Sequence, residues 1–267
     1  MSRVDIERGM AGTIPYAAVG SGKTVVVCSG LWPTAGVDSE WLVRGAIIPL
    51  RRMGSRRLVV LNRRRNLATD VGMRELASEY ADAIRSGLGA PVDVLGTSTG
   101  GSIAQQLAAD HSDVVGRLVL LSTACRLGPV GREVQSRVAG YLRAGRDRAA
   151  VATISADLAP SGFRTLARGL GWASARHVLG DAAAAADLAT ILEAEDGFDL
   201  AQCSNAIQAT TLIVAGGRDR YYSRGLFAET AALIPNSHLR LFGRRGHMTV
   251  ANDPRAQATI AGFLSES

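Results

Sequence analysis

The sequence predicts an α/β protein whose mainly parallel sheet is covered by helices on both faces, and three observations indicate this. Short apolar runs rich in valine, isoleucine and leucine alternate with amphipathic segments along most of the 267 residues. These runs are short and almost wholly apolar, which is typical of strands buried on both faces of a parallel sheet. One long stretch, residues 125–209, contains helical patterns only and interrupts the alternation.

Seven runs are predicted to be strands because each is short, apolar and bounded by glycine, proline or polar residues. They lie at residues 14–18, 24–28, 58–61, 92–95, 117–121, 211–215 and 239–242. The Gly-Ser-Gly-Lys segment at 20–23 is expected to form a hairpin turn between the first two. It also resembles the end of a phosphate-binding loop, but that motif requires a glycine where Ala17 stands and a helix after Thr24. We therefore do not expect nucleotide binding.

Amphipathic helices are predicted between the strands from apolar residues spaced three or four apart. The first covers about 38–53, with Asp38-Ser39-Glu40 as its N-terminal cap. Further helices are predicted at about 72–87, from just after residue 98, and at about 253–264.

The helical stretch at 125–209 is predicted to be an insertion into the sheet domain. It is rich in alanine, leucine and arginine, and both of its ends return to strands of the same sheet. A connection of this length is too long for a linker without a role of its own. We expect a core formed by residues 1–124 and 210–267 and a helical cap, or lid, formed by residues 125–209, in preference to a separate helical domain.

Composition and charge exclude several classes of protein. The net charge of +6 comes from residues 51–65, which hold seven arginines and no acidic residue, so the rest of the chain is close to neutral and no nucleic-acid partner is expected. No apolar run approaches the roughly 18 residues of a membrane-spanning helix, and the polar start predicts no signal peptide. Cys28, Cys125 and Cys203 lack metal-site spacing and are predicted to be free thiols of a cytoplasmic protein.

A serine motif follows the predicted strand at 92–95. Residues 96–100 read Gly-Thr-Ser-Thr-Gly, a G-x-S-x-G pattern between a strand and a helix. In that context the turn is so tight that only small residues such as Gly96 and Gly100 fit beside Ser98. The hydroxyl then projects at the helix N-terminus, where the peptide dipoles favour developing negative charge.

Two further side chains are predicted to meet this serine at one edge of the sheet. Asp219 follows the strand at 211–215, and His247 follows the strand at 239–242. Ligands bind in open α/β sheets outside the carboxyl ends of the strands, so all three side chains lie on the ligand-binding edge. A serine needs a base, and the base needs a group that orients it.

Together these features resemble the α/β-hydrolase superfamily, in the branch with a helical cap inserted after the sixth strand. The resemblance covers nearly the whole chain and implies an eight-stranded, mostly parallel sheet. It implies that Ser98 is the nucleophile, His247 the general base and acid, and Asp219 the orienting carboxylate. It also implies an oxyanion hole formed by the N–H groups of Thr99 and Leu31, and it requires no metal, nucleotide or redox cofactor.

The chain departs from this family at two loops. Ser29-Gly30 stands where many relatives have His-Gly, and Asn62-Arg63-Arg64-Arg65-Asn66 replaces an acidic residue followed by a glycine-rich turn. These departures leave the substrate open. A serine nucleophile disfavours epoxide opening and halide removal, because relatives with those activities carry aspartate at this position.

Aromatic and basic residues near the predicted catalytic edge are candidates for a substrate pocket: Trp32, Arg63, Arg64, Trp172 and Tyr221. Because Arg63, Arg64 and Arg65 follow a strand at that edge, one hypothesis is that they attract a substrate carboxylate or phosphate. Four acidic residues of the insertion are expected to form a solvated helix end instead of a metal site: Glu193, Glu195, Asp196 and Asp199.

Three functions are consistent with the sequence. The first is a serine hydrolase that cleaves an ester, thioester or lactone of a small to medium organic substrate through an acyl-enzyme. The second is cleavage or rearrangement of a carbon–carbon bond by the same triad without a cofactor. The third is a ligand-binding protein that keeps the fold without turnover. The expected partner is a small molecule, and the oligomeric state is not readable from the sequence.

Overall fold

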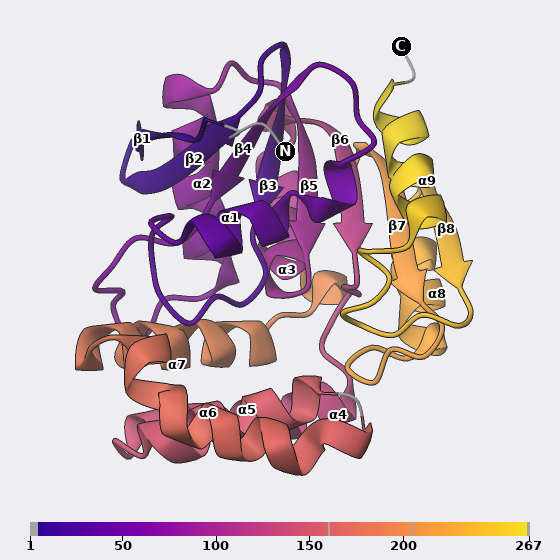
Figure 1. The fold of residues 1–267 in the computed structure, drawn as a ribbon. Helices are drawn as coiled ribbons and strands as arrows, with labels where there is room; N and C mark the ends of the chain where they lie inside the picture. The colour runs from indigo at the N-terminus through magenta and orange to yellow at the C-terminus, as the bar shows by residue number, and fades with distance from the viewer. Residues whose placement is uncertain (1–4, 160, 204, 266–267) are drawn as a thin grey trace.

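The computed structural model describes residues 5–159, 161–203 and 205–265. It contains an eight-stranded sheet with the strand order β1-β2-β4-β3-β5-β6-β7-β8 (Figure 1). The strands are β1 (Glu7–Ala11), β2 (Ile14–Val19), β3 (Lys23–Cys28), β4 (Arg56–Leu61), β5 (Val92–Thr97), β6 (Val115–Leu121), β7 (Thr210–Gly216) and β8 (Ser237–Phe242). The pairs β1–β2 and β2–β4 are antiparallel. All other neighbouring strands of the sheet, from β4 through β3 to β8, are parallel. The predicted fold class is confirmed.

Nine α-helices occur in the described ranges. They are α1 (Glu40–Ala46), α2 (Met73–Gly87), α3 (Thr99–Asp110), α4 (Pro129–Arg143), α5 (Asp147–Leu158), α6 (Arg164–Leu179), α7 (Ala182–Asp196), α8 (Arg224–Leu233) and α9 (Pro254–Ser265). The helix predicted at 38–53 is shorter than expected: α1 ends at Ala46 and a 3-10 turn, Ile48–Leu50, follows it. Pro49 lacks the N–H that would continue the α-helix. The cap is as predicted, since Ser39 Oγ accepts a hydrogen bond from the Leu42 N–H.

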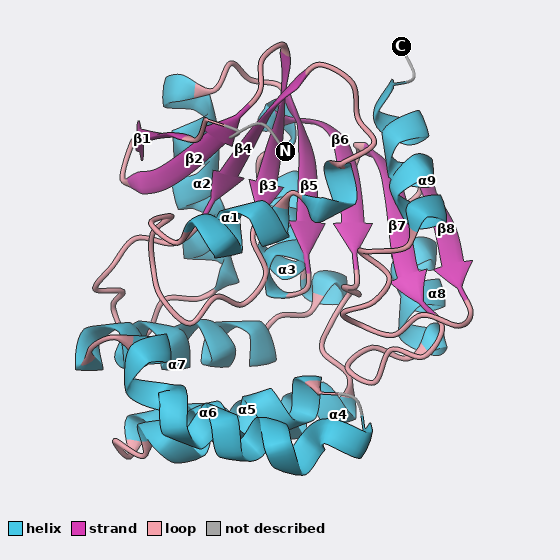
Figure 2. Cartoon of the chain, in the orientation of Figure 1, coloured by secondary structure: helices cyan, strands magenta, loops and turns pink. Residues whose placement is uncertain are grey.

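Helices cover both faces of the sheet and create two hydrophobic layers (Figure 2). On one face, α2, α3 and α8 contribute Tyr80, Leu107 and Phe227. On the other face, α1 and α9 contribute Val43 and Ile260. Successive side chains of a strand point to opposite faces, so β3 supplies both layers and is buried from Val25 to Cys28.

The turn predicted at 20–23 is not a hairpin. Strand β2 pairs with β1 and β4, with Tyr16 opposite Leu61, and the chain crosses over the start of β4 to reach β3. The glycines are needed for that passage: Gly20 has φ +82°, and a Cβ there would lie 2.4 Å from the Arg56 carbonyl oxygen. Only glycine tolerates this conformation and this contact. The hairpin joins β1 to β2. Strand β1 was not predicted because its sequence, ERGMA, is that of a polar edge strand.

The inserted helices, defined here as α4–α7, occupy the chain between β6 and β7. Figure 2 shows them beyond the arrowheads of the parallel strands, at the carboxyl edge of the sheet, with α7 nearest to it. They have a hydrophobic core of their own, which includes Val138, Val151 and Leu188. Leu31 packs against this core and against the sheet's own core, so it lies between the two.

The three cysteines carry free thiols. Burial raises the pKa of the Cys28 thiol to about 12, so the reactive thiolate is scarce at neutral pH. In the described ranges, no helix combines the length and the apolar character that crossing a bilayer requires.

Candidate active site

Ser98 lies at a strained turn between β5 and α3. Its backbone angles are φ 51° and ψ −126°, outside the regions that most residues adopt. The turn is as tight as the motif predicts: a Cβ on Gly96 would lie 2.6 Å from the Ala104 Cβ, and one on Gly100 would lie 2.2 Å from the Cys28 carbonyl oxygen. The glycines therefore allow helix α3 and the loop after β3 to approach the serine closely.

The structure brings the three predicted triad side chains together. His247 Nε2 lies 3.1 Å from Ser98 Oγ, and His247 Nδ1 lies 2.8 Å from Asp219 Oδ2. The Asp219 side chain is fully buried and that of His247 is 12% exposed. With the ring proton on Nδ1 donated to Asp219, Nε2 is free to accept the proton of the serine hydroxyl. Their order, from nucleophile to base to orienting carboxylate, is the one that acyl transfer requires.

The turn after β7 orients the Asp219 carboxylate. Oxygen Oδ1 accepts hydrogen bonds from the N–H groups of Tyr221 at 2.9 Å and Tyr222 at 3.1 Å, which leaves Oδ2 for the histidine. Both tyrosine rings lie against His247, with ring centroids 4.9 and 5.9 Å from the imidazole. Burial raises the pKa of both tyrosine hydroxyls, so they stay neutral beside the pair.

The loop that carries His247 is held at two places. Ser122 Oγ donates a hydrogen bond to the His247 carbonyl oxygen at 2.9 Å. Arg245 Nε donates to Asp253 Oδ2 at 2.7 Å, and the Asp253 side chain, which precedes α9, is 1% exposed. Hydrogen bonds from Arg255 and Arg245 hold the pKa of Asp253 well below its ordinary value.

We expect Asp253→Asn to lower the free energy of unfolding at pH 7 by about 1–2 kcal/mol, because charge-assisted hydrogen bonds are lost. A carboxyl whose pKa is lowered on folding stabilises the protein above its unfolded pKa of about 3.9 and loses this contribution on acidification. Urea unfolding at pH 7, 5 and 3 should therefore show a difference between variant and wild type that shrinks at pH 3. A difference that does not change with pH would contradict this assignment.

The loop after β3 packs directly on the serine turn. A Cβ on Gly30 would lie 3.2 Å from the Thr97 carbonyl oxygen and 3.7 Å from the Ser98 Cβ. This places Leu31, the next residue, beside the turn that carries Ser98 and Thr99. Its role as an oxyanion donor stays a prediction.

The residues that depart from the family pattern support this loop. Ser29 Oγ lies 3.4 Å from Asn62 Oδ1, and Asn62 Nδ2 donates to the carbonyl oxygens of Thr34 at 2.9 Å and Gly36 at 2.7 Å. Arg63 is buried and donates to the Trp32 carbonyl oxygen at 3.0 Å. Burial lowers its pKa to about 10, so it remains a cation at neutral pH.

The five candidate pocket residues occupy different places. Tyr221 lies against His247, as described above. Trp32 is buried in the sheet core, and Trp172 is 52% exposed on α6, where Arg148 stacks 4.2 Å from its ring. Arg63 supports the loop after β3, and Arg64 pairs with Glu79 at 3.0 Å.

The arginines at 63–65 all have protein partners in the structure, and their attraction of a substrate anion stays a prediction. Besides the contacts of Arg63 and Arg64, Arg65 pairs with Asp181 at the start of α7, at 2.5 Å. The last pair joins the loop after β4 to the inserted helices.

The expectation of a solvated helix end is wrong for Glu195. Glu195 is only 1% exposed, and its carboxylate contacts four polar side chains. The periodicity of α7 carried the signal, because Glu195 follows Leu188 by seven positions and Ile191 by four, on the buried face of the helix. By contrast, Glu193 is exposed and pairs with Arg143.

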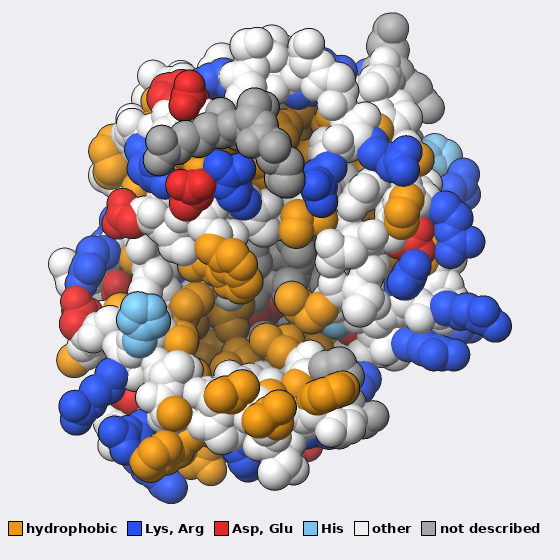
Figure 3. Space-filling model, in the orientation of Figure 1, with side chains coloured by type: hydrophobic (Ala, Val, Ile, Leu, Met, Phe, Trp, Pro, Cys, Tyr) orange, Lys and Arg blue, Asp and Glu red, His pale blue; other side chains and the backbone are white. Residues whose placement is uncertain are grey.

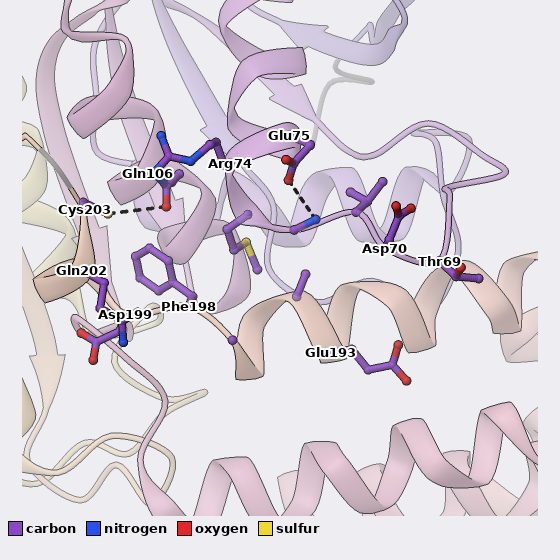
Figure 4. A pocket seen from close by; sticks show the side chains of 15 residues that line it. Thr69, Asp70, Arg74, Glu75, Gln106, Glu193, Phe198, Asp199, Gln202 and Cys203 are labelled. Carbon is purple, nitrogen blue, oxygen red and sulfur yellow. Dashed lines mark hydrogen bonds between the residues drawn. The ribbon is translucent and has the colours of Figure 1, made fainter.

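Figure 3 shows a recess lined with hydrophobic side chains between the sheet domain and the inserted helices. A separate hollow of about 540 Å³ lies between the start of α2 and the end of α7 (Figure 4). Its lining includes Arg74, Phe198 and Cys203 but none of the three triad side chains.

Comparison with known proteins agrees with this architecture. Residues 25–260 match a family model described as the alpha/beta hydrolase family. Similar solved structures include an enol-lactonase from Burkholderia xenovorans LB400, with 18% identity, a TM-score of 0.73 and coverage of 97% of this chain and 100% of that chain. An esterase from Exiguobacterium antarcticum has 19% identity, a TM-score of 0.71 and coverage of 95% and 96%. A thermophilic esterase from Thermogutta terrifontis has 20% identity, a TM-score of 0.69 and coverage of 97% and 98%. At these identities the likeness shows a shared fold.

Proposed function

Since the chain belongs to the alpha/beta hydrolase family, we propose that it is a serine hydrolase that cleaves an ester, thioester or lactone through an acyl-enzyme. The observation that carries the proposal is the continuous line of contacts from Ser98 Oγ through His247 to Asp219, at 3.1 and 2.8 Å. Similar structures that are described as an enol-lactonase and an esterase support ester-type bonds as the substrate class.

In the proposed reaction Ser98 Oγ attacks the substrate carbonyl carbon while His247 Nε2 takes the hydroxyl proton. The Thr99 and Leu31 N–H groups stabilise the negative oxygen of the tetrahedral intermediate, each worth about 2.7–4 kcal/mol in measured cases. The imidazolium then gives its proton to the leaving alcohol or thiol, and the acyl group stays on Ser98. Water, deprotonated by His247, attacks the acyl carbon; the bond from that carbon to Ser98 Oγ then breaks, the imidazolium returns its proton to Oγ, and the carboxylic acid leaves.

The inserted helices are proposed to act as a cap over this site, so that the core comprises residues 1–124 and 210–267 and the cap residues 125–209. Their position at the carboxyl edge of the sheet supports this, as does the apolar recess between them and the sheet domain (Figure 3). A recess lined with hydrophobic side chains suits the organic part of a small to medium acyl substrate better than a highly charged one.

A fluorophosphonate probe tests the proposal directly. The nucleophilic oxygen displaces fluoride from phosphorus, and the adduct is located by peptide mass spectrometry. We expect the wild-type protein to be labelled at Ser98 and Ser98→Ala not to be labelled. Ser78→Ala, which alters a serine of α2 that contacts the Arg74 carbonyl oxygen, should label like wild type. Absence of labelling in folded wild-type protein, or labelling at another residue, would overturn the proposal.

A further inference from the structure

Glu195 is a carboxylate of the inserted helices that reaches into the sheet domain beside the triad. Thr99 Oγ1 donates to Oε2 at 2.7 Å, and Tyr222 Oη donates to Oε1 at 3.0 Å. Gln135 Nε2 of α4 donates to Oε2 at 2.8 Å, and Ser102 Oγ lies 3.4 Å from Oε1. One side chain of α7 therefore joins α3, α4 and the turn after β7.

Two of these contacts lead to groups of the proposed mechanism. Thr99 carries the N–H that is proposed to bind the oxyanion, and Glu195 fixes its side chain. Tyr222 donates its N–H to Asp219 Oδ1 at 3.1 Å, and its ring lies 5.9 Å from that of His247. The Tyr222 hydroxyl, at the other end of the same side chain, is fixed by Glu195. Both ends of the triad thus have a neighbour that depends on this carboxylate.

The surroundings of the Glu195 carboxyl group supply hydrogen-bond donors to both of its oxygens. A fully buried carboxylate is costly unless its oxygens are hydrogen-bonded, and here all four contacts are to side chains that can donate. Burial raises the pKa of Glu195 above its ordinary value, and the hydrogen bonds from Thr99, Gln135 and Tyr222 and the attraction to His247 offset only part of that rise. The carboxylate also faces the first turn of α3, where the helix dipole favours an anion.

We propose that Glu195 is a positioning residue of the hydrolase site, acting through Thr99 on the oxyanion donor and through Tyr222 on the Asp219–His247 pair. The proposal rests on the proposed serine hydrolase function. It makes the inserted helices part of the catalytic arrangement, because the group that orients Thr99 and Tyr222 belongs to α7 and not to the sheet domain.

Asp187 provides a matched control on the same helix. Its side chain is also buried and also joins α7 to the sheet domain, by accepting hydrogen bonds from the N–H groups of Asn66 at 3.0 Å and Leu67 at 2.8 Å. These partners belong to the loop after β4 and not to the triad. Asp187→Asn therefore measures what it costs to weaken the attachment of α7 alone.

The test compares Glu195→Gln with Asp187→Asn and with Glu193→Gln, an exposed position of the same helix. We expect Glu195→Gln to lower kcat and the rate of fluorophosphonate labelling by about 10- to 100-fold, with KM changed less than about threefold. The reason is that the carboxylate that holds Thr99 and Tyr222 is lost. Asp187→Asn should lower Tm as much or more but keep kcat within about twofold. Glu193→Gln should behave like wild type.

Two further measurements separate positioning from packing. Thr99→Val keeps the N–H but removes the hydroxyl, and its effect on kcat should be less than additive with that of Glu195→Gln, because both substitutions alter the contact between Thr99 and Glu195. The NMR resonance of the His247 Nδ1 proton should shift in Glu195→Gln and stay in place in Asp187→Asn. This readout does not depend on turnover.

The outcomes are distinct for the two proposals. If Ser98→Ala, measured in parallel, keeps wild-type activity, the serine hydrolase function fails. If Ser98→Ala is inactive but Glu195→Gln keeps wild-type kcat, or loses it only in proportion to Asp187→Asn with an unmoved His247 resonance, the positioning role is overturned.

Discussion

Replacing Asp219 with asparagine is expected to lower kcat by about 10⁴-fold, which is the effect measured for the equivalent change in a serine protease. The physical reason is the tautomer of His247. An asparagine Nδ2 in the place of Oδ2, 2.8 Å from His247 Nδ1, donates a hydrogen bond there and turns Nδ1 into an acceptor. The ring proton then lies on Nε2, which can no longer take the proton of Ser98.

The same substitution should leave the stability nearly unchanged, since asparagine keeps the oxygen that accepts from the N–H groups of Tyr221 and Tyr222. The measurement is kcat on a generic short acyl ester, together with urea unfolding of wild type and variant. Asp219→Ala serves as the comparison, because it removes both sets of contacts and should cost stability as well. A tenfold or smaller loss of kcat in a folded Asp219→Asn protein would contradict the role given to this carboxylate.

Replacing Gly100 with alanine is expected to destabilise the protein by about 3 kcal/mol or more. The added Cβ would lie 2.2 Å from the carbonyl oxygens of Cys28 and Ser29, and these backbone atoms cannot turn away as a flexible side chain could. To relieve the clash, α3 or the loop after β3 must move, and both carry groups of the proposed oxyanion hole. Activity should therefore fall even in the fraction that remains folded.

Urea unfolding followed by circular dichroism measures the stability, and the rate of fluorophosphonate labelling below the transition measures the site. Gly140→Ala is the control, because a Cβ there, in the last turn of α4, meets nothing within 4 Å. It should be neutral or stabilise the protein by up to about 1 kcal/mol. Equal stabilities of the two variants would show that the contact at Gly100 is not the constraint described here.

Five of the seven arginines of the basic segment at 51–65 contact other parts of the chain: Arg56, Arg57, Arg63, Arg64 and Arg65. Arg56 donates to the Leu264 carbonyl oxygen at 2.9 Å, and Arg57 pairs with Glu7 at 3.1 Å. Arg63 holds the Trp32 carbonyl oxygen beneath the loop after β3. These contacts connect β4 and the loop after it to both ends of the sheet domain and to the loop after β3.

The sequence by itself determined the alternation of strands and helices, the tight serine turn and the edge at which Ser98, Asp219 and His247 meet. These features depend on local patterns, and the carboxyl ends of parallel strands necessarily share one edge of a sheet. The periodicity of α7 also carried the signal that Glu195 is buried, although its polar neighbours concealed it.

Only the tertiary structure decided which strands pair, what the arginines of the basic segment contact and what surrounds Glu195. The pairing of β2 with β4 and the contacts of Glu195 with Thr99 and Gln135 join residues that lie far apart in the chain, 96 and 60 positions apart in the two Glu195 contacts. A charged residue looks alike in sequence whether it faces water or a buried set of donors. Whether burying that residue is costly depends on hydrogen-bond partners that only folding brings close to it.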